Sequence, residues 1–163
     1  MSELNVIVRD ARNAERLYPI DDQVSTGSRS NFRTVKVASG DLAVVDANNI
    51  IFAWENPEPN QIIVYEVIIN VTTVATNAAT MDVDRVNDAV SHGATILDAI
   101  DLNAAIATFD SHNVTDAGAT GNEKPRLLNA QGSATNAWIT GYESAAQPTD
   151  GIVGKYYIYY TEA

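Results

Sequence analysis

The sequence contains no cysteine, so it can form neither a disulfide framework nor a thiolate metal site, and its fold must depend on packing alone. It has no run approaching the ~20 apolar residues that a membrane-spanning helix needs. Ten Lys and Arg residues stand against 21 Asp and Glu residues, and the net charge of −11 argues against nucleic acid as a partner. We therefore expect no membrane insertion and no nucleic-acid binding.

Residues 1–32 lack the pattern of a protein core. Residues 1–17 carry charges throughout, which predicts no signal peptide and synthesis in a cytoplasm. Residues 9–16 are polar on every face, Tyr18-Pro19 would break a helix, and residues 24–31 are rich in turn formers. This segment is either a frayed terminus or an extended N-terminal arm and linker that orders on a neighbouring subunit.

The charge distribution favours the arm. Residues 1–36 hold six basic and five acidic groups, whereas the remaining 127 residues hold four basic and sixteen acidic groups. Arginine pairs well with carboxylates, so the Arg-rich start of one chain would complement the acidic remainder of another.

Residues 33–163 have the pattern of short antiparallel strands. The strongest signal is residues 61–73, where an extended chain places five apolar side chains on one face: Ile63, Tyr65, Val67, Ile69 and Val71. Alternation or short apolar runs recur at 32–38, 42–45, 50–54, 80–86, 95–102, 126–128, 137–142 and 154–161. Strands spaced in this way, without a βαβ rhythm, predict an all-β antiparallel sandwich, jelly-roll-like, with eight or nine strands.

Two local patterns refine this prediction. Leu102, Ile106 and Phe109 recur at helical spacing, and Asp101 or Asn103 could cap the segment, so we predict one short helix over an open end of the sandwich. The last strand has aromatic residues on both faces: Tyr156, Ile158 and Tyr160 share one face, and Tyr157 and Tyr159 share the other. That strand is therefore expected to be covered on both sides, by the core within and by an arm or partner outside.

The candidate sites for chemistry are few. Asp82 and Asp84 would share one face of a strand and could bind a hard cation, and five further aspartates are near in sequence, but the calcium-loop pattern is absent. The five are Asp88, Asp98, Asp101, Asp110 and Asp116. We interpret them as a solvated acidic surface.

The other candidates have equally plain interpretations. The two histidines, His92 and His112, lie in turn-like stretches and are interpreted as surface loop residues. Three glutamates near Trp54 resemble a two-carboxylate sugar cleft only faintly, and we expect them to face solvent: Glu55, Glu58 and Glu66. The glycines of 118–121 and 151–154 are turn glycines. We therefore assign no catalytic, cofactor-binding or metal-binding residue, and the sequence predicts a protein that is not an enzyme.

Several segments of the second half resemble a family. They are residues 79–89 (ATMDVDRVNDA), 95–110 (TILDAIDLNAAIATFD), 116–128 (DAGATGNEKPRLL), 137–145 (AWITGYESA) and 151–163 (GIVGKYYIYYTEA). Together they resemble a group of small virion structural proteins of tailed viruses. The matching positions include Thr80, Asp82, Val83, Asp98, Ile100, Asp101, Ala104, Ala105, Phe109, Ile139, Thr140, Gly141, Val153, Gly154, Lys155, Tyr157, Ile158 and Tyr160.

The resemblance implies a β-sandwich component of the head or its decoration, and it carries over no catalytic residue. We therefore expect a capsid decoration or cement subunit that binds the major capsid protein and copies of itself, as a homotrimer in the virion. Two alternatives stay open: a tail or receptor-binding spike component, and a carbohydrate-binding sandwich that stacks sugars on Trp54, Trp138 or the terminal tyrosines.

Overall fold

The computed structural model describes residues 5–9, 15–19, 34–43, 49–113, 126–144 and 152–163. The chain divides into two compact units, Met1–Phe32 and Arg33–Ala163, here called the N-terminal unit and the body. Within the stretch predicted to be an extended arm, β1 (Asn5–Arg9) and β2 (Glu15–Pro19) pair antiparallel as a hairpin. The backbone register runs from Asn5 opposite Pro19 to Arg9 opposite Glu15.

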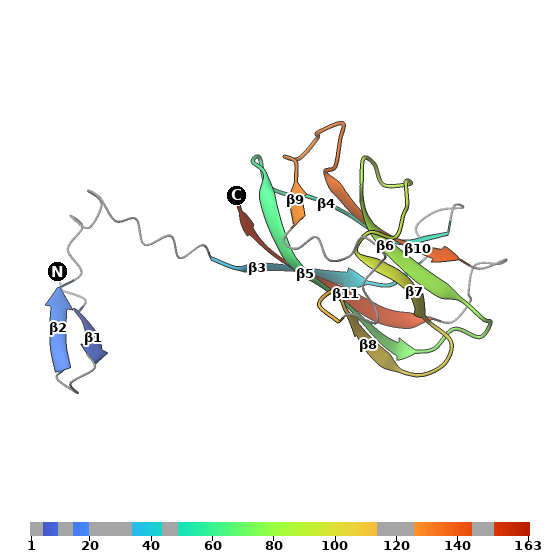
Figure 1. Cartoon of the computed structure of the whole chain (residues 1–163), viewed down its shortest axis with the longest axis horizontal. Coiled ribbons are helices and arrows are strands. Elements are labelled where there is room, and N and C mark those ends of the chain that lie inside the picture. The colour runs from blue at the N-terminus through green and yellow to red at the C-terminus, as the bar shows by residue number, and fades with distance from the viewer. Residues whose placement is uncertain (1–4, 10–14, 20–33, 44–48, 114–125, 145–151) are drawn as a thin grey trace. The chain divides into compact units, whose positions relative to one another are not determined.

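The body consists of two antiparallel sheets (Figure 1). The four-stranded sheet has the order β4-β10-β6-β7, formed by Ile50–Glu55, Trp138–Ser144, Thr80–Val86 and Leu97–Asp101. The five-stranded sheet has the order β3-β11-β5-β8, formed by Lys36–Asp41, Val153–Glu162, Ile62–Thr73 and Ala107–Asp110, with β9 (Arg126–Leu128) also paired to β5. The predicted β-sandwich is confirmed.

The connectivity is that of a jelly roll. β8 and β9 pair with different parts of β5, at residues 68–71 and 62–64, and so act as two pieces of one edge strand. We number the strands of the body from one (β3) to eight (β11) in chain order and count β8 and β9 together as strand six. The five-stranded sheet then has the order 1-8-3-6, and the four-stranded sheet has the order 2-7-4-5. This order arises when two Greek keys wrap around a common core.

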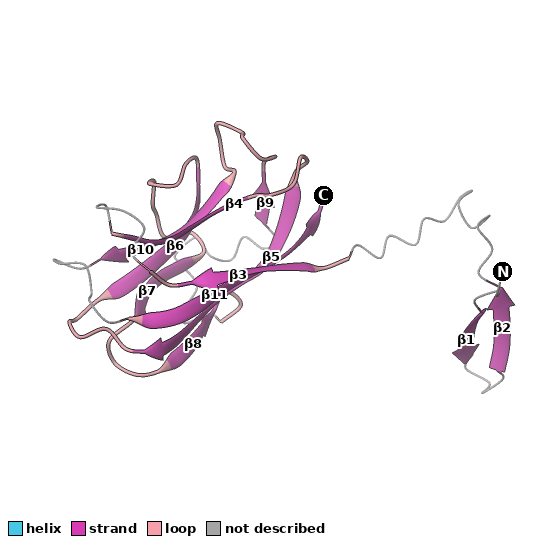
Figure 2. Cartoon of the chain, turned by 180° about the vertical axis from the view of Figure 1, so that it is seen from behind, coloured by secondary structure: helices cyan, strands magenta, loops and turns pink. Residues whose placement is uncertain are grey.

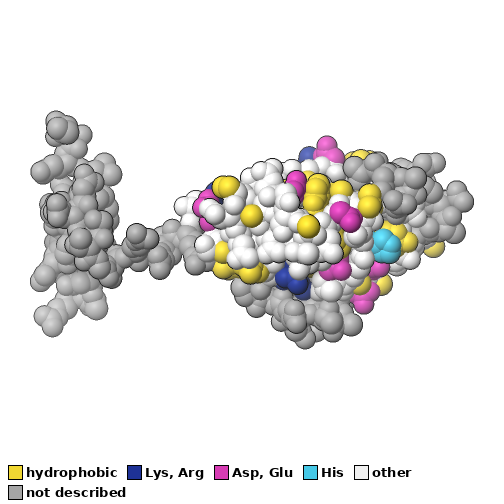
Figure 3. All heavy atoms as spheres, turned by 90° about the horizontal axis from the view of Figure 1, so that it is seen from above, with side chains coloured by type: hydrophobic (Ala, Val, Ile, Leu, Met, Phe, Trp, Pro, Cys, Tyr) yellow, Lys and Arg dark blue, Asp and Glu magenta, His cyan; other side chains and the backbone are white. Residues whose placement is uncertain are grey.

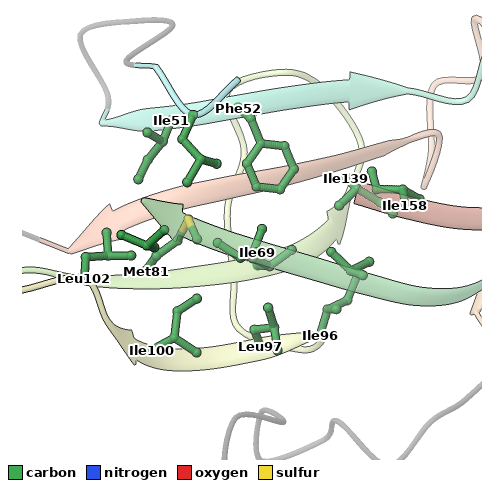
Figure 4. Packing of buried hydrophobic residues seen from close by; sticks show 14 of the residues in the cluster. Ile51, Phe52, Ile69, Met81, Ile96, Leu97, Ile100, Leu102, Ile139 and Ile158 are labelled. Atoms are coloured by element: carbon green, nitrogen blue, oxygen red, sulfur yellow. The ribbon is translucent and has the colours of Figure 1, made fainter. Parts of the chain in front are cut away.

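Apolar side chains from both sheets fill the space between them (Figure 4). Ile69 on β5 and Ile158 on β11 approach Met81 and Ile139 of the other sheet, and all four are fully buried. Across the sheets Phe52 stacks on Tyr156, with ring centroids 4.4 Å apart. Such packing supplies the stability that a chain without disulfides needs.

A bulge divides the long strand β5 into two halves. Glu66 lies opposite Tyr159 and Val64 lies opposite Tyr160, so Tyr65 is an extra residue without a direct partner. From Val67 onward the odd positions are buried, as predicted, but before the bulge it is Ile62 and Val64 that are buried. The prediction that Ile63 and Tyr65 share the inner face is therefore wrong, and Tyr65 is instead exposed.

Two other predictions are corrected by the structure. Residues 102–106 form bends and β8 follows them, so the predicted short helix is replaced by a turn and an edge strand; Figure 2 shows only strands and loops in the described parts of the chain. Asp101 does act as a cap, because its carboxylate accepts hydrogen bonds from the backbone N–H groups of Asn103 and Ala104, but it caps this turn. The strand predicted at residues 32–38 is instead β3, which begins at Lys36 and continues to Asp41.

Candidate contact face and carboxylate–histidine cluster

The outer face of the five-stranded sheet carries aromatic and aliphatic side chains. On β11 the buried Ile158 and Tyr160 point inward, so Tyr157 and Tyr159 point outward and are half-buried. Cross-strand neighbours share a face, and the pairs of the register extend this surface over β3, β5 and β9. We call it the tyrosine face and define it as Val37, Ile63, Ile68, Leu127, Tyr157 and Tyr159.

Two members of the tyrosine face, and the bulge residue of β5, are open to solvent. Val37 is 53% exposed and Leu127 is 43% exposed, and Tyr65 at the bulge is 38% exposed. Seen from above the view of Figure 1, the body also has exposed hydrophobic side chains that lie among acidic ones (Figure 3). Aromatic and aliphatic side chains gathered on the outer face of a sheet are typical of a surface that a protein partner covers.

Ion pairs border the tyrosine face. Lys155 Nζ lies 2.6 Å from Asp41 Oδ1 across the β11–β3 pair. Lys36 Nζ lies 2.6 Å from Glu58 Oε1 and 2.7 Å from Glu162 Oε1, and its hydrogen bonds to these carboxylates raise the pKa of Lys36. These pairs are largely exposed, so each contributes little to stability and mainly sets a polar border.

Glu66, Asp110 and His112 converge at the β5–β8 side of the tyrosine face. Glu66 is on β5, Asp110 ends β8 opposite Ile68, and His112 is in the following turn. His112 Nδ1 lies 3.3 Å from Asp110 Oδ1 and 3.5 Å from Glu66 Oε1. Partial burial and the neighbouring Asp110 carboxylate raise the pKa of Glu66, and His112 opposes that shift. Among the described residues, this is the group whose donor atoms lie close enough together to hold a metal ion.

The acidic candidates of β6 have structural partners. Asp82 Oδ1 accepts a hydrogen bond of 2.7 Å from the backbone N–H of Ala99. Asp84 accepts hydrogen bonds from the backbone N–H of Arg85 and from the hydroxyl of Thr95. Both carboxylates are half-buried and hold the segment that includes β7 against β6, so they do more than form the solvated acidic surface that the sequence suggested. Asp116 and the glycines 118, 121 and 151 lie outside the described residues.

The three glutamates near Trp54 do not form a cleft. Glu55 Oε1 accepts a hydrogen bond from the N–H of Gly132, Glu58 pairs with Lys36, and Glu66 belongs to the cluster with His112. The ring of Trp54 packs against the core and is tilted against Tyr160, with centroids 5.4 Å apart. This packing leaves Trp138 and the outer tyrosines as the aromatic groups available for a carbohydrate.

The two histidines lie on different sheets. His92 stacks on Tyr142 of the four-stranded sheet, with ring centroids 3.9 Å apart, whereas His112 follows β8 of the five-stranded sheet. Sequence reasoning considered Glu66, Asp110 and His112 separately and missed their convergence. A signal exists in hindsight, because Asp110 and His112 are two residues apart, but their meeting with Glu66 requires the β5–β8 register.

Asp88 shows how the loop after β6 is held. Its Oδ1 accepts hydrogen bonds from the N–H groups of Val90 and Ser91, and hydrogen bonding to Ser91 and Val90 lowers the pKa of Asp88. A lowered pKa in the folded state means that the stabilisation is present at neutral pH and is lost as pH falls through that pKa. We therefore expect Asp88→Ala to unfold at lower denaturant than the wild type at neutral pH, with the difference closing in acid.

The control for Asp88→Ala is Asp98→Ala, which removes an exposed carboxylate of β7. Urea titrations at several pH values measure both variants. A difference between Asp88→Ala and the wild type that stays constant down to strongly acidic pH would contradict the role of the carboxylate.

Comparisons of the chain with protein-family models, with curated proteins and with solved structures gave no match. In the part of the chain that the structure describes, no helix is long and apolar enough to cross a membrane.

Proposed function

We propose that this chain is a non-enzymatic structural protein of a virion, a decoration subunit that binds the capsid shell of a tailed virus through its tyrosine face. The resemblance of its second half to small virion proteins supports this class. The jelly-roll body supports it as well, because a small sandwich offers broad sheet faces for contact. The protein would be made in the host cytoplasm and would act in the virion.

The tyrosine face is the observation that carries the proposal. Tyrosine supplies a large apolar ring and a polar hydroxyl at a low entropic cost, and it is enriched at the centres of protein interfaces. Tyr157 and Tyr159 occupy the second strand of the sheet, between β3 and β5, with Val37 exposed beside Tyr159. The capsid protein would cover this surface.

Self-association is the second part of the proposal. The Arg-rich first 36 residues of one copy would meet the acidic remainder of the next and give a homotrimer. A trimer presents three tyrosine faces at once, so contacts that are individually weak would give strong attachment. The mass of the purified chain in solution tests this part, and a monomer at working concentration would contradict it.

Replacing the outer tyrosines is expected to weaken capsid attachment. Tyr157→Thr and Tyr159→Thr remove the rings and keep a residue suited to a strand. Losing a tyrosine at the hot spot of an interface costs about 2 kcal/mol or more, so each variant should bind roughly 30-fold more weakly to shells assembled from the major capsid protein of the same virus. Co-sedimentation measures the binding.

The matched control is Val90→Ser, because Val90 is 49% exposed in the loop after β6, away from the tyrosine face. Full capsid binding by both tyrosine variants would refute this contact. Attachment to purified tails instead of shells would favour the spike alternative, and tyrosine-dependent binding on a glycan array would favour the carbohydrate alternative.

A further inference from the structure

The cluster of Glu66, Asp110 and His112 has the composition of a metal site. Two carboxylate oxygens and one imidazole nitrogen converge, and the three donor atoms lie within 4.8 Å of one another. Their side chains are 28%, 37% and 49% exposed, so an ion in solution can reach them. Imidazole favours Zn²⁺ and similar transition metals over Mg²⁺ and Ca²⁺, which prefer oxygen ligands alone.

The two separations from the imidazole nitrogen fit one small ion. Two ligands bound to Zn²⁺ at about 2.1 Å and at the tetrahedral angle lie roughly 3.4 Å apart. The separations from His112 Nδ1 are 3.3 Å to Asp110 Oδ1 and 3.5 Å to Glu66 Oε1. Three protein ligands and a water molecule would complete a four-coordinate site.

The backbone holds the donors in place. Asp110 is registered on β5 opposite Ile68, and its carbonyl accepts a hydrogen bond from the N–H of Asn113. The buried Ser111 anchors the turn, because its hydroxyl accepts a hydrogen bond from the N–H of Val67 and its own N–H donates to the Val67 carbonyl, both at 3.0 Å. Val67 follows Glu66 directly, so the β5 ligand and the turn are fixed to each other.

Charge supplies the driving force. Two carboxylates held side by side repel one another, and the chain as a whole already carries a net charge of −11. A dication between the two carboxylates would neutralise both of them. Its bonds to their oxygens and to the imidazole would take the place of the direct contacts that His112 now makes with those oxygens.

We propose that Glu66, Asp110 and His112 bind one divalent cation of the Zn²⁺ type. The ion would join the end of β8 to β5 at the border of the tyrosine face. The site is independent of capsid binding, and it would stand if the protein attached to a different partner.

The test uses the full chain without a histidine tag, stripped with a chelator and dialysed. Calorimetric titration with ZnCl₂ should show one saturable site per chain. His112→Ala and Glu66→Gln should each weaken binding at least tenfold, in line with the loss of one ligand. Co²⁺ should give the visible absorption of a tetrahedral ion in the wild type and lose it in His112→Ala.

His92→Ala is the matched control, because His92 is the other histidine of the chain and stacks on Tyr142. It should bind Zn²⁺ like the wild type. The proposal is overturned if the wild type shows no saturable binding, if His112→Ala binds unchanged, or if His92→Ala weakens binding equally. Equal affinity for Mg²⁺ would also overturn it, since that result would indicate a general acidic surface. Circular dichroism without metal should show all three variants folded.

Discussion

Gly154→Ala is expected to destabilise the body by about 3 kcal/mol, the upper range for forcing an extra methyl group into a packed site. A Cβ at position 154 would overlap the backbone carbonyl oxygen of Asn70 and would lie 2.8 Å from Leu42 Cδ1 and 3.2 Å from Val71 Cα. Asn70 and Val71 belong to the central strand β5, which cannot move without disturbing β8 and β11. Urea denaturation measures the loss.

Gly132→Ala is the control for this prediction. Gly132 has a φ of 74°, and a Cβ there would meet no atom within 4 Å, so its cost is the strain of a left-handed backbone alone, about 1 kcal/mol. A Gly154→Ala variant no less stable than Gly132→Ala would show that the close approach of β11 to β5 is wrong.

Asn56→Asp is expected to cost about 3 kcal/mol at neutral pH, because it replaces a buried donor with a charge. Asn56 is fully buried, and its Nδ2 donates to the carbonyls of Asn60 at 2.9 Å and Asn129 at 2.8 Å. Its Oδ1 accepts a hydrogen bond from the N–H of Glu58. A carboxylate would keep that last bond but would face two carbonyl oxygens.

The penalty for Asn56→Asp should shrink in acid. Burial against carbonyl oxygens raises the pKa of the introduced carboxyl, so the penalty is present above that pKa and diminishes as pH falls through it, when the proton restores one donor. Asn60→Asp, an exposed change in the same loop, should be nearly neutral throughout. Equal stability of the two variants at neutral pH would contradict the bridging role of Asn56.

Strands with clean alternation were predictable from the sequence. The segment 80–86 is a strand as expected, since Met81 and Val83 are buried while Asp82 and Asp84 face outward. The alternation of buried and exposed side chains along a strand is a local property of the chain. A core on one side of the sheet is sufficient to determine which of the two sets is buried.

The helix predicted in segment 102–110 is absent from the structure. Two local signals, the helical spacing of apolar residues and a possible cap at its start, had both favoured it. Leu102 is buried, but Ile106 is 70% exposed, so the helical spacing did not mark one buried face. Pairing of Ala107–Asp110 with β5 outweighed the weak helical preference of a short segment. The bulge at Tyr65 was equally hidden, because it depends on the register of β11 against β5.

The candidate site was less predictable than the fold. The alternation of the last strand placed Tyr157 and Tyr159 on one face, but only the burial of Ile158 and Tyr160 shows that this face is the outer one. The cluster was not expected, because Glu66 is 44 residues before Asp110 and meets it only through the β5–β8 pairing. The buried Asn56 was missed for a similar reason, because its partner Asn129 belongs to a distant loop.

The position of β3 next to β11 has a consequence for engineering. Lys36 begins β3 opposite Tyr160 near the end of β11, and its ammonium group reaches Glu162, so the body begins and finishes at neighbouring points. A short linker could therefore join Ala163 to the start of β3, and new termini could be opened in the turn at residues 130–133 without breaking a strand pair. Such a circular permutant would detach the N-terminal unit from the body and should still fold into the same sandwich.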